Sequence, residues 1–64
     1  MRWNEIEDIA EALEEHYPDE EVEDIRPQDL HDLIITLNEF DDDTAKPSDR
    51  ILEAVREAWL EIRG

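Results

Sequence analysis

Several residue types that commonly define a small protein are scarce in this sequence. It has no cysteine, one glycine, and Lys46 as its single lysine. Without cysteine the chain can form neither a disulfide framework nor a thiolate metal site. No apolar run exceeds a triplet such as Leu33-Ile34-Ile35, whereas a membrane-spanning helix needs about 20 apolar residues. We therefore expect a cytoplasmic protein with no signal peptide and no membrane contact.

The length of the chain limits what it can build. With 64 residues there is room for one domain, which we expect to span residues 1–64 around one small core. A deep catalytic cleft is not expected at this size. No serine or threonine has a histidine at a suggestive spacing, and the many carboxylates are expected on the faces opposite the core. The sequence therefore predicts a protein that is not an enzyme.

Acidic residues dominate the composition. There are 21 Asp and Glu residues against 6 Lys and Arg, which gives a formal net charge of −15. Such a charge repels nucleic acid and anionic lipid and attracts basic protein surfaces. We expect a monomer that does not bind nucleic acid and that docks on a basic partner. Two alternatives remain open: a disordered acidic chain, or a salt-adapted domain without a partner.

Apolar residues at helical spacing argue against disorder and predict three helices. The first is expected from a cap at Asn4, with Glu7 at the capping-box position, to about His16, where Pro18 stops it. The second is expected from about Gln28 to Glu39. The third follows a cap at Ser48, with Gly64 as its terminator. Its apolar stripe is expected to comprise Ile51, Leu52, Val55, Ala58, Trp59 and Ile62.

The connecting segments predict how these helices are arranged. Residues 18–27 are predicted to form a connector that is fixed to the core by Val22 and Ile25. The segment from Asp41 to Pro47 is predicted to be a loop. Links this long are unusual in an up-and-down bundle, so an all-α, orthogonal three-helix domain is favoured. The expected core is Ile6, Ile9, Leu13, Tyr17, Ile25, Leu30, Leu33, Ile34, Leu37, Phe40, Ile51, Leu52, Val55 and Trp59.

A few polar and aromatic residues allow a structural or a functional interpretation. The run Asp41-Asp42-Asp43 is either a weak site for a hard cation or a solvated loop, and its spacing does not fit an EF-hand. His31 is expected to be a hydrogen-bonded residue at the edge of the helix rather than half of a metal site with Asp29 or Asp32. Arg26 is expected to tie the connector to carboxylates such as Asp19 or Asp29. Trp59 is expected in the core, and Trp3 either in the core or at a binding surface.

Five sequence elements form a characteristic pattern: Trp3, Ile9-x-x-x-Leu13-x-x-x-Tyr17-Pro18-Asp19, Arg26-x-x-Asp29-Leu30-His31-x-x-Ile34-x-x-Leu37, Phe40-Asp41-Asp42-Asp43 and Ile51-Leu52-Glu53-Ala54-x-x-x-x-Trp59-Leu60. These elements extend over nearly the whole chain without a gap. Their order resembles the IscX family of iron–sulfur cluster assembly proteins. Departures from the family pattern are Pro27-Gln28, where an aromatic residue and a Ser or Thr cap are usual, and the less acidic end at Ile62-Arg63-Gly64.

This resemblance implies a helical fold related to winged-helix or helix-turn-helix domains that does not bind DNA. It also implies a role as an accessory protein that binds the pyridoxal-phosphate cysteine desulfurase, competes there with bacterial frataxin and binds iron weakly. No tightly bound cofactor is expected, only weakly bound Fe(II) or Fe(III), with Asp29, Asp41, Asp42 and Asp43 as the expected ligands. The alternative functions are an iron carrier or donor for cluster assembly, and an acidic interaction domain with no metal role. The expected partner-binding residues are Glu5, Asp8, Glu11, Asp29, Asp32, Asp41, Asp42 and Asp43.

Overall fold

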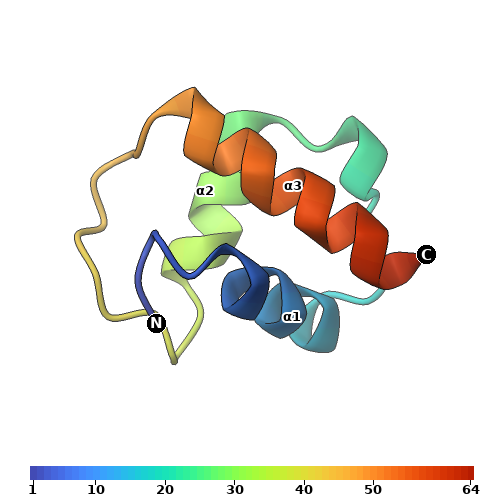
Figure 1. Cartoon of the computed structure of the whole chain (residues 1–64), viewed down its shortest axis with the longest axis horizontal. Coiled ribbons are helices and arrows are strands. Elements are labelled where there is room, and N and C mark those ends of the chain that lie inside the picture. Colours follow the sequence, from blue (N-terminus) through green and yellow to red (C-terminus); the bar gives the residue numbers. More distant parts are fainter.

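A computed structural model describes all 64 residues of the chain. It contains α1 (Ile6–His16), a short 3-10 helix η1 (Val22–Asp24), α2 (Pro27–Ile35) and α3 (Asp49–Arg63), and no strand. Helices α1 and α3 lie side by side and α2 runs across them (Figure 1). The predicted all-helical class is confirmed, whereas the relationship to winged-helix or helix-turn-helix folds stays a prediction. None of these helices has the length and apolar character needed to span a membrane.

Helix α1 starts later than predicted and ends as predicted. The Asn4 cap is wrong, because the helix is preceded by Glu5 and no side chain caps it. Residues 2–5 instead close a turn, in which the backbone N–H of Glu5 donates to Arg2 O at 2.9 Å and the Arg2 N–H donates to Glu5 Oε1 at 2.7 Å. This turn holds the chain out of helical geometry until Ile6. Pro18 disfavours helical geometry at Tyr17, so α1 ends at His16.

The connector after α1 is fixed to the core in the predicted way. Val22 begins η1 and is only 2% exposed, and the half-buried Ile25 packs against the same core. Arg26, in contrast, is exposed and takes part in none of the ion pairs of the structure. The predicted tie from Arg26 to Asp19 or Asp29 is therefore not formed.

Helix α2 is shorter than predicted, ending at Ile35 instead of Glu39. The hydroxyl of Thr36 donates to the carbonyl of Leu33 at 2.7 Å and competes with continuation of the helix. Two tight turns follow, because the N–H of Leu37 donates to Ile34 O and the N–H of Phe40 donates to Leu37 O, each at 3.1 Å. These turns bring Leu37 into the core without further helix.

Helix α3 is capped at both ends as predicted. The N–H of Ile51 donates to Ser48 Oγ at 3.4 Å, and Gly64, with φ of +81°, closes the other end by donating to Leu60 O. The last turn departs from the prediction, because Ile62 is 42% exposed. The guanidinium of Arg63 lies over the Trp59 ring, 5.4 Å from its centroid. Arg63 therefore covers the end of the core, where the predicted apolar stripe had placed Ile62.

The core contains residues from every helix and from the segment ahead of α1. Its members are Trp3, Ile9, Ala10, Ala12, Leu13, Val22, Leu30, Ile34, Leu37, Leu52, Val55 and Trp59. The predicted members Ile6, Tyr17, Ile25, Leu33, Phe40 and Ile51 are half-buried around it. Trp3, absent from the predicted core, is only 8% exposed. No charged or polar residue is buried, so all the carboxylates remain at the surface.

The burial pattern predicts which truncations unfold the protein. Leu30→Ala and Ile34→Ala each remove a fully buried side chain and should cost about 2 to 5 kcal/mol, which is comparable with the whole stability of a small domain. Ile62→Ala removes an exposed side chain of similar size and should change the free energy of unfolding by less than about 0.5 kcal/mol. Urea unfolding followed by circular dichroism measures all three. A large loss from Ile62→Ala would contradict the packing described here.

Candidate functional site: the acidic surface and its aspartate loop

The aspartate loop, residues 41–44, is pinned to the N-terminal segment by Trp3. The indole N–H of Trp3 donates to Asp43 O at 2.7 Å, and the backbone N–H of Trp3 donates to Asp42 Oδ2 at 3.1 Å. The other oxygen of Asp42 accepts from the N–H of Asp43 at 2.7 Å. These N–H groups, that of Asp43 first and that of Trp3 second, hold the pKa of Asp42 below its usual value. The loop is therefore a bonded element rather than a free acidic tail.

Aromatic packing around Trp3 also positions His31, which bonds the end of the same loop. Trp3 stacks on His31 with ring centroids 5.9 Å apart and meets Phe40 edge-on at 4.6 Å. His31 Nε2 lies 2.8 Å from Thr44 O, and because a carbonyl only accepts, this nitrogen carries the proton. The prediction that His31 is a hydrogen-bonded residue at the edge of the helix is confirmed.

The carboxylates proposed as iron ligands do not gather in one place. Asp41 Oδ1 lies 3.0 Å from the N-terminal ammonium, and Asp43 Oδ1 accepts from the N–H of Ala45 at 2.9 Å. Asp29 lies apart from the loop, in the first turn of α2. Nowhere do three or more His, Cys, Asp or Glu side chains converge as a metal site requires. Iron binding by Asp29, Asp41, Asp42 and Asp43 stays a prediction.

One face of α1 forms an acidic hollow, which we call the acidic groove. It has a volume of about 380 Å³ and is lined by Met1, Glu5, Asp8, Glu11, Ala12, Glu15 and Glu39. Positions 11 and 12 follow position 8 by three and four residues, and position 15 follows them by four and three, so all four share one face of the helix. The groove thus brings the predicted residues Glu5, Asp8 and Glu11 together on one surface.

Two carboxylates of the acidic groove were not among the predicted partner-binding residues. Glu15 follows the same helical spacing as Asp8 and Glu11, so the periodicity of α1 was a sufficient signal for it. Glu39 comes from the turn after α2 and is reached by His16, whose Nε2 lies 3.5 Å from Glu39 Oε2. A hydrogen bond from its own backbone N–H, and secondly the contact with His16, lower the pKa of Glu39. No local pattern reveals such a long-range contact.

The remaining predicted residues lie outside the acidic groove. Asp29 and Asp32 are exposed on α2, and Asp32 Oδ1 is 3.8 Å from His31 Nδ1. Asp42 is half-buried beside Trp3. The six ion pairs of the structure engage only six of the 21 acidic side chains, so most of the negative charge has no partner within the molecule.

One carboxylate has a structural task instead. Glu14 Oε1 accepts from the indole N–H of the buried Trp59 at 2.8 Å and from Arg63 Nη2 at 2.9 Å. The bond from Trp59 is the main cause, and that from Arg63 the second, of a pKa of Glu14 below its usual value. Glu14 therefore ties α1 to the last turns of α3.

The fold and the surface define a small, all-helical, strongly acidic protein with its carboxylates outside the core. Comparison with known proteins specifies the class. Residues 1–63 match the family described as iron-sulphur cluster assembly, which is the IscX family, and the chain belongs to it. It is 32% identical over 63 residues to an uncharacterised protein of Pseudomonas aeruginosa, an alignment that covers 98% of this chain and 96% of the relative.

The lowered pKa of Glu14 makes part of the stability dependent on pH. A carboxyl with a lower pKa in the folded state stabilises the fold above its unfolded pKa of about 4.5, and this contribution disappears as the pH falls toward the folded pKa. In Glu14→Gln the amide oxygen still accepts from Trp59 but no longer titrates. The variant should therefore lose less melting temperature than the parent between about pH 5 and pH 3. An equal decrease in melting temperature for the parent and the Glu14→Gln variant would contradict this role of Glu14.

Proposed function

We propose that this protein is a cytoplasmic accessory protein of iron–sulfur cluster assembly that docks its acidic groove on a basic surface of the cysteine desulfurase. The observation that carries this proposal is the gathering of Glu5, Asp8, Glu11, Glu15 and Glu39 on one face. A single exposed carboxylate selects no partner, but five on a continuous surface match a cluster of Arg and Lys. Membership of an iron–sulfur assembly family supports a partner in that process.

The energetics of such a contact determine how it behaves. Each exposed ion pair contributes only about 0.2 to 1 kcal/mol, so affinity must come from several pairs acting together. The long-range field of a molecule with a net charge of −15 also accelerates the encounter with a basic surface. Both contributions weaken as salt shortens the range of the field, which falls to about 10 Å at 0.1 M ionic strength.

The proposal predicts a strong dependence of binding on ionic strength. Calorimetric titration of this protein into the cysteine desulfurase should give an affinity that falls at least about tenfold between about 50 mM and 300 mM salt. The triple variant Asp8→Asn/Glu11→Gln/Glu15→Gln should weaken binding about tenfold at low salt, since three pairs at about 0.5 kcal/mol each are lost.

A matched control separates the groove from net charge alone. The variant Asp19→Asn/Glu21→Gln/Glu57→Gln removes the same charge from exposed positions outside the acidic groove and should retain nearly full affinity. Equal losses in the two triple variants would show that only the overall charge matters.

The variant Asp29→Asn/Asp32→Asn tests whether the acidic residues of α2 contribute to binding as the sequence predicts. An affinity that does not change with salt would refute electrostatic docking.

Weak iron binding at the aspartate loop is a second proposal. Asp41 and Asp43 are exposed, and each uses only Oδ1 within the molecule, which leaves Oδ2 of both for a hard cation. Titration with Fe(II) under anaerobic conditions should broaden the amide signals of residues 41–44 first. Asp41→Asn/Asp43→Asn should abolish this selective broadening, whereas Asp19→Asn/Glu21→Gln should preserve it. Faint broadening spread over all acidic residues would reduce the effect to counterion condensation.

A further inference from the structure

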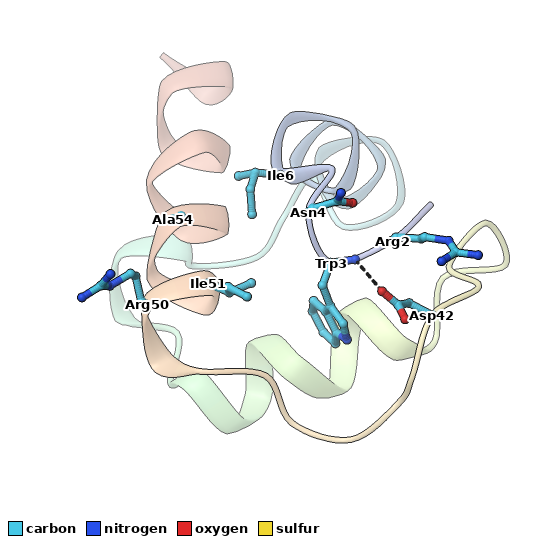
Figure 2. Close-up of a pocket in the computed structure, with 8 residues that line it drawn as sticks. All are labelled: Arg2, Trp3, Asn4, Ile6, Asp42, Arg50, Ile51 and Ala54. Carbon is cyan, nitrogen blue, oxygen red and sulfur yellow. Dashed lines mark hydrogen bonds between the residues drawn. The ribbon is translucent and has the colours of Figure 1, made fainter.

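A second groove has a different chemical character. It lies between the N-terminal segment, the start of α1 and the start of α3, and it has a volume of about 510 Å³ (Figure 2). We call it the N-terminal groove, and its lining residues are Arg2, Trp3, Asn4, Ile6, Asp42, Arg50, Ile51 and Ala54. Its size is within the range of about 300 to 1,000 Å³ that is usual for ligand sites.

The middle of the N-terminal groove is apolar. Ile6 and Ile51 approach each other from α1 and α3 while Trp3 lies below them in Figure 2, and both isoleucines are only half-buried. The indole N–H of Trp3 is already used by Asp43 O, so this side chain offers the groove only apolar surface. Ala54 is small and leaves space beside Ile51. A bulky apolar side chain entering here would remove exposed apolar surface from water.

Two arginines flank this apolar centre. In Figure 2 Arg2 and Arg50 lie on opposite sides of the apolar centre, and both guanidinium groups point outward from it. Neither forms an ion pair, although the chain contains 21 acidic side chains, whereas Lys46, Arg56 and Arg63 are all paired. Two of the few unpaired cations of a very acidic molecule thus border one groove. Complementary charge at both ends of an occupant would be needed to engage them.

Further hydrogen-bonding groups face the same region. Asn4 is exposed and does not cap α1, which begins without any side-chain cap. The amide of Asn4, which lines the groove, therefore remains available to an occupant. Asp42 accepts from Asp43 and Trp3, and the charge of Arg2 is a lesser cause of its lowered pKa, so an occupant would share Arg2 with this carboxylate.

We propose that the N-terminal groove binds an extended acidic peptide segment of another protein. One bulky apolar side chain of the segment enters between Ile6 and Ile51, and carboxylates on either side of it pair with Arg2 and Arg50. A fatty acid would supply a carboxylate for only one arginine. A basic segment would leave both arginines facing like charge. The segment is thus opposite in charge to the partner of the acidic groove.

The net charge of the protein gives this contact an unusual salt dependence. An acidic segment is repelled by the molecule at long range and attracted by Arg2 and Arg50 only on contact. Salt screens the repulsion from a net charge of −15 as well as the two contacts. Affinity for an acidic peptide should therefore hold or rise between about 20 mM and 150 mM salt, whereas affinity for a basic partner falls.

The test uses an acetylated and amidated pentapeptide, Gly-Glu-Leu-Glu-Gly, titrated into the isotope-labelled full chain and followed by NMR. The expected result is a set of saturable shifts confined to the indole N–H of Trp3, the methyl groups of Ile6 and Ile51, and the amide of Ala54. A peptide with glutamine in place of glutamate should bind more weakly. A peptide with lysine in those positions should shift the acidic groove instead.

Variants assign the contacts to particular side chains. Arg2→Gln and Arg50→Gln should each weaken binding about twofold to fivefold, as expected for an exposed ion pair. Arg26→Gln removes an unpaired arginine that does not line the groove and should leave the affinity unchanged. Ala54→Leu should reduce binding at least about tenfold by filling the space beside Ile51. Melting temperatures close to that of the parent confirm that the variants are folded.

Several results would overturn the proposal. Equal affinity for the glutamate and glutamine peptides would mean that the arginines are not used. Binding of octanoate with the same dependence on the arginines would indicate a small amphipathic carboxylate, and concentration-dependent sedimentation lost in Ala54→Leu would indicate a second copy of the chain. Absence of localised shifts at millimolar peptide would show that the groove does not bind such a segment.

Discussion

A small apolar core has to hold together a chain that repels itself. Twelve buried residues supply the attraction, and the molecule they organise has 64 residues and a net charge of −15. No charged group is buried, and no buried side-chain nitrogen or oxygen lacks a hydrogen bond. The core therefore carries no desolvation penalty from unpaired polar groups, which a domain of this size could not offset. The exclusion of every carboxylate from this core creates the acidic exterior.

The few cations are placed where they reduce the repulsion between chain segments. Arg63 contacts the carbonyls of Tyr17 and Glu20 as well as the carboxylate of Glu14, and so joins the end of α3 to the connector. Arg56 bonds Glu53 within α3 and reaches the carbonyl of Glu23 in η1. Both arginines hold a segment of the chain that has few apolar anchors of its own. They act as structural ties, whereas Arg2 and Arg50 have no such task.

Residue periodicity was sufficient to predict most of the fold, because helix formation and burial of one face are local properties of sequence. It located three helices, the Ser48 cap, the loop after Phe40 and the burial of Trp59. The errors have two causes. Trp3 is buried by contacts distant in sequence, with His31, Phe40 and the aspartate loop, whereas α2 ends early because of a local hydrogen bond from Thr36 to its own preceding turn, which the spacing of apolar residues does not reveal. The α1 face of the acidic groove was predictable from the sequence. The contribution of Glu39, and the position of Asp29 and Asp32 outside the groove, could be learned only from the tertiary structure.

The N-terminal segment connects the two grooves. Met1 lines the acidic groove, while Arg2, Trp3 and Asn4 line the N-terminal groove. Trp3 fixes the position of this segment through its bonds to Asp42 and Asp43 and its contacts with His31 and Phe40. A shift of the aspartate loop would move the Met1 edge of the acidic groove and the Trp3 wall of the N-terminal groove, and would leave the α1 face of the acidic groove in place. The two grooves thus share the loop that holds the N-terminal segment, which is the kind of common element that coupling between two sites requires.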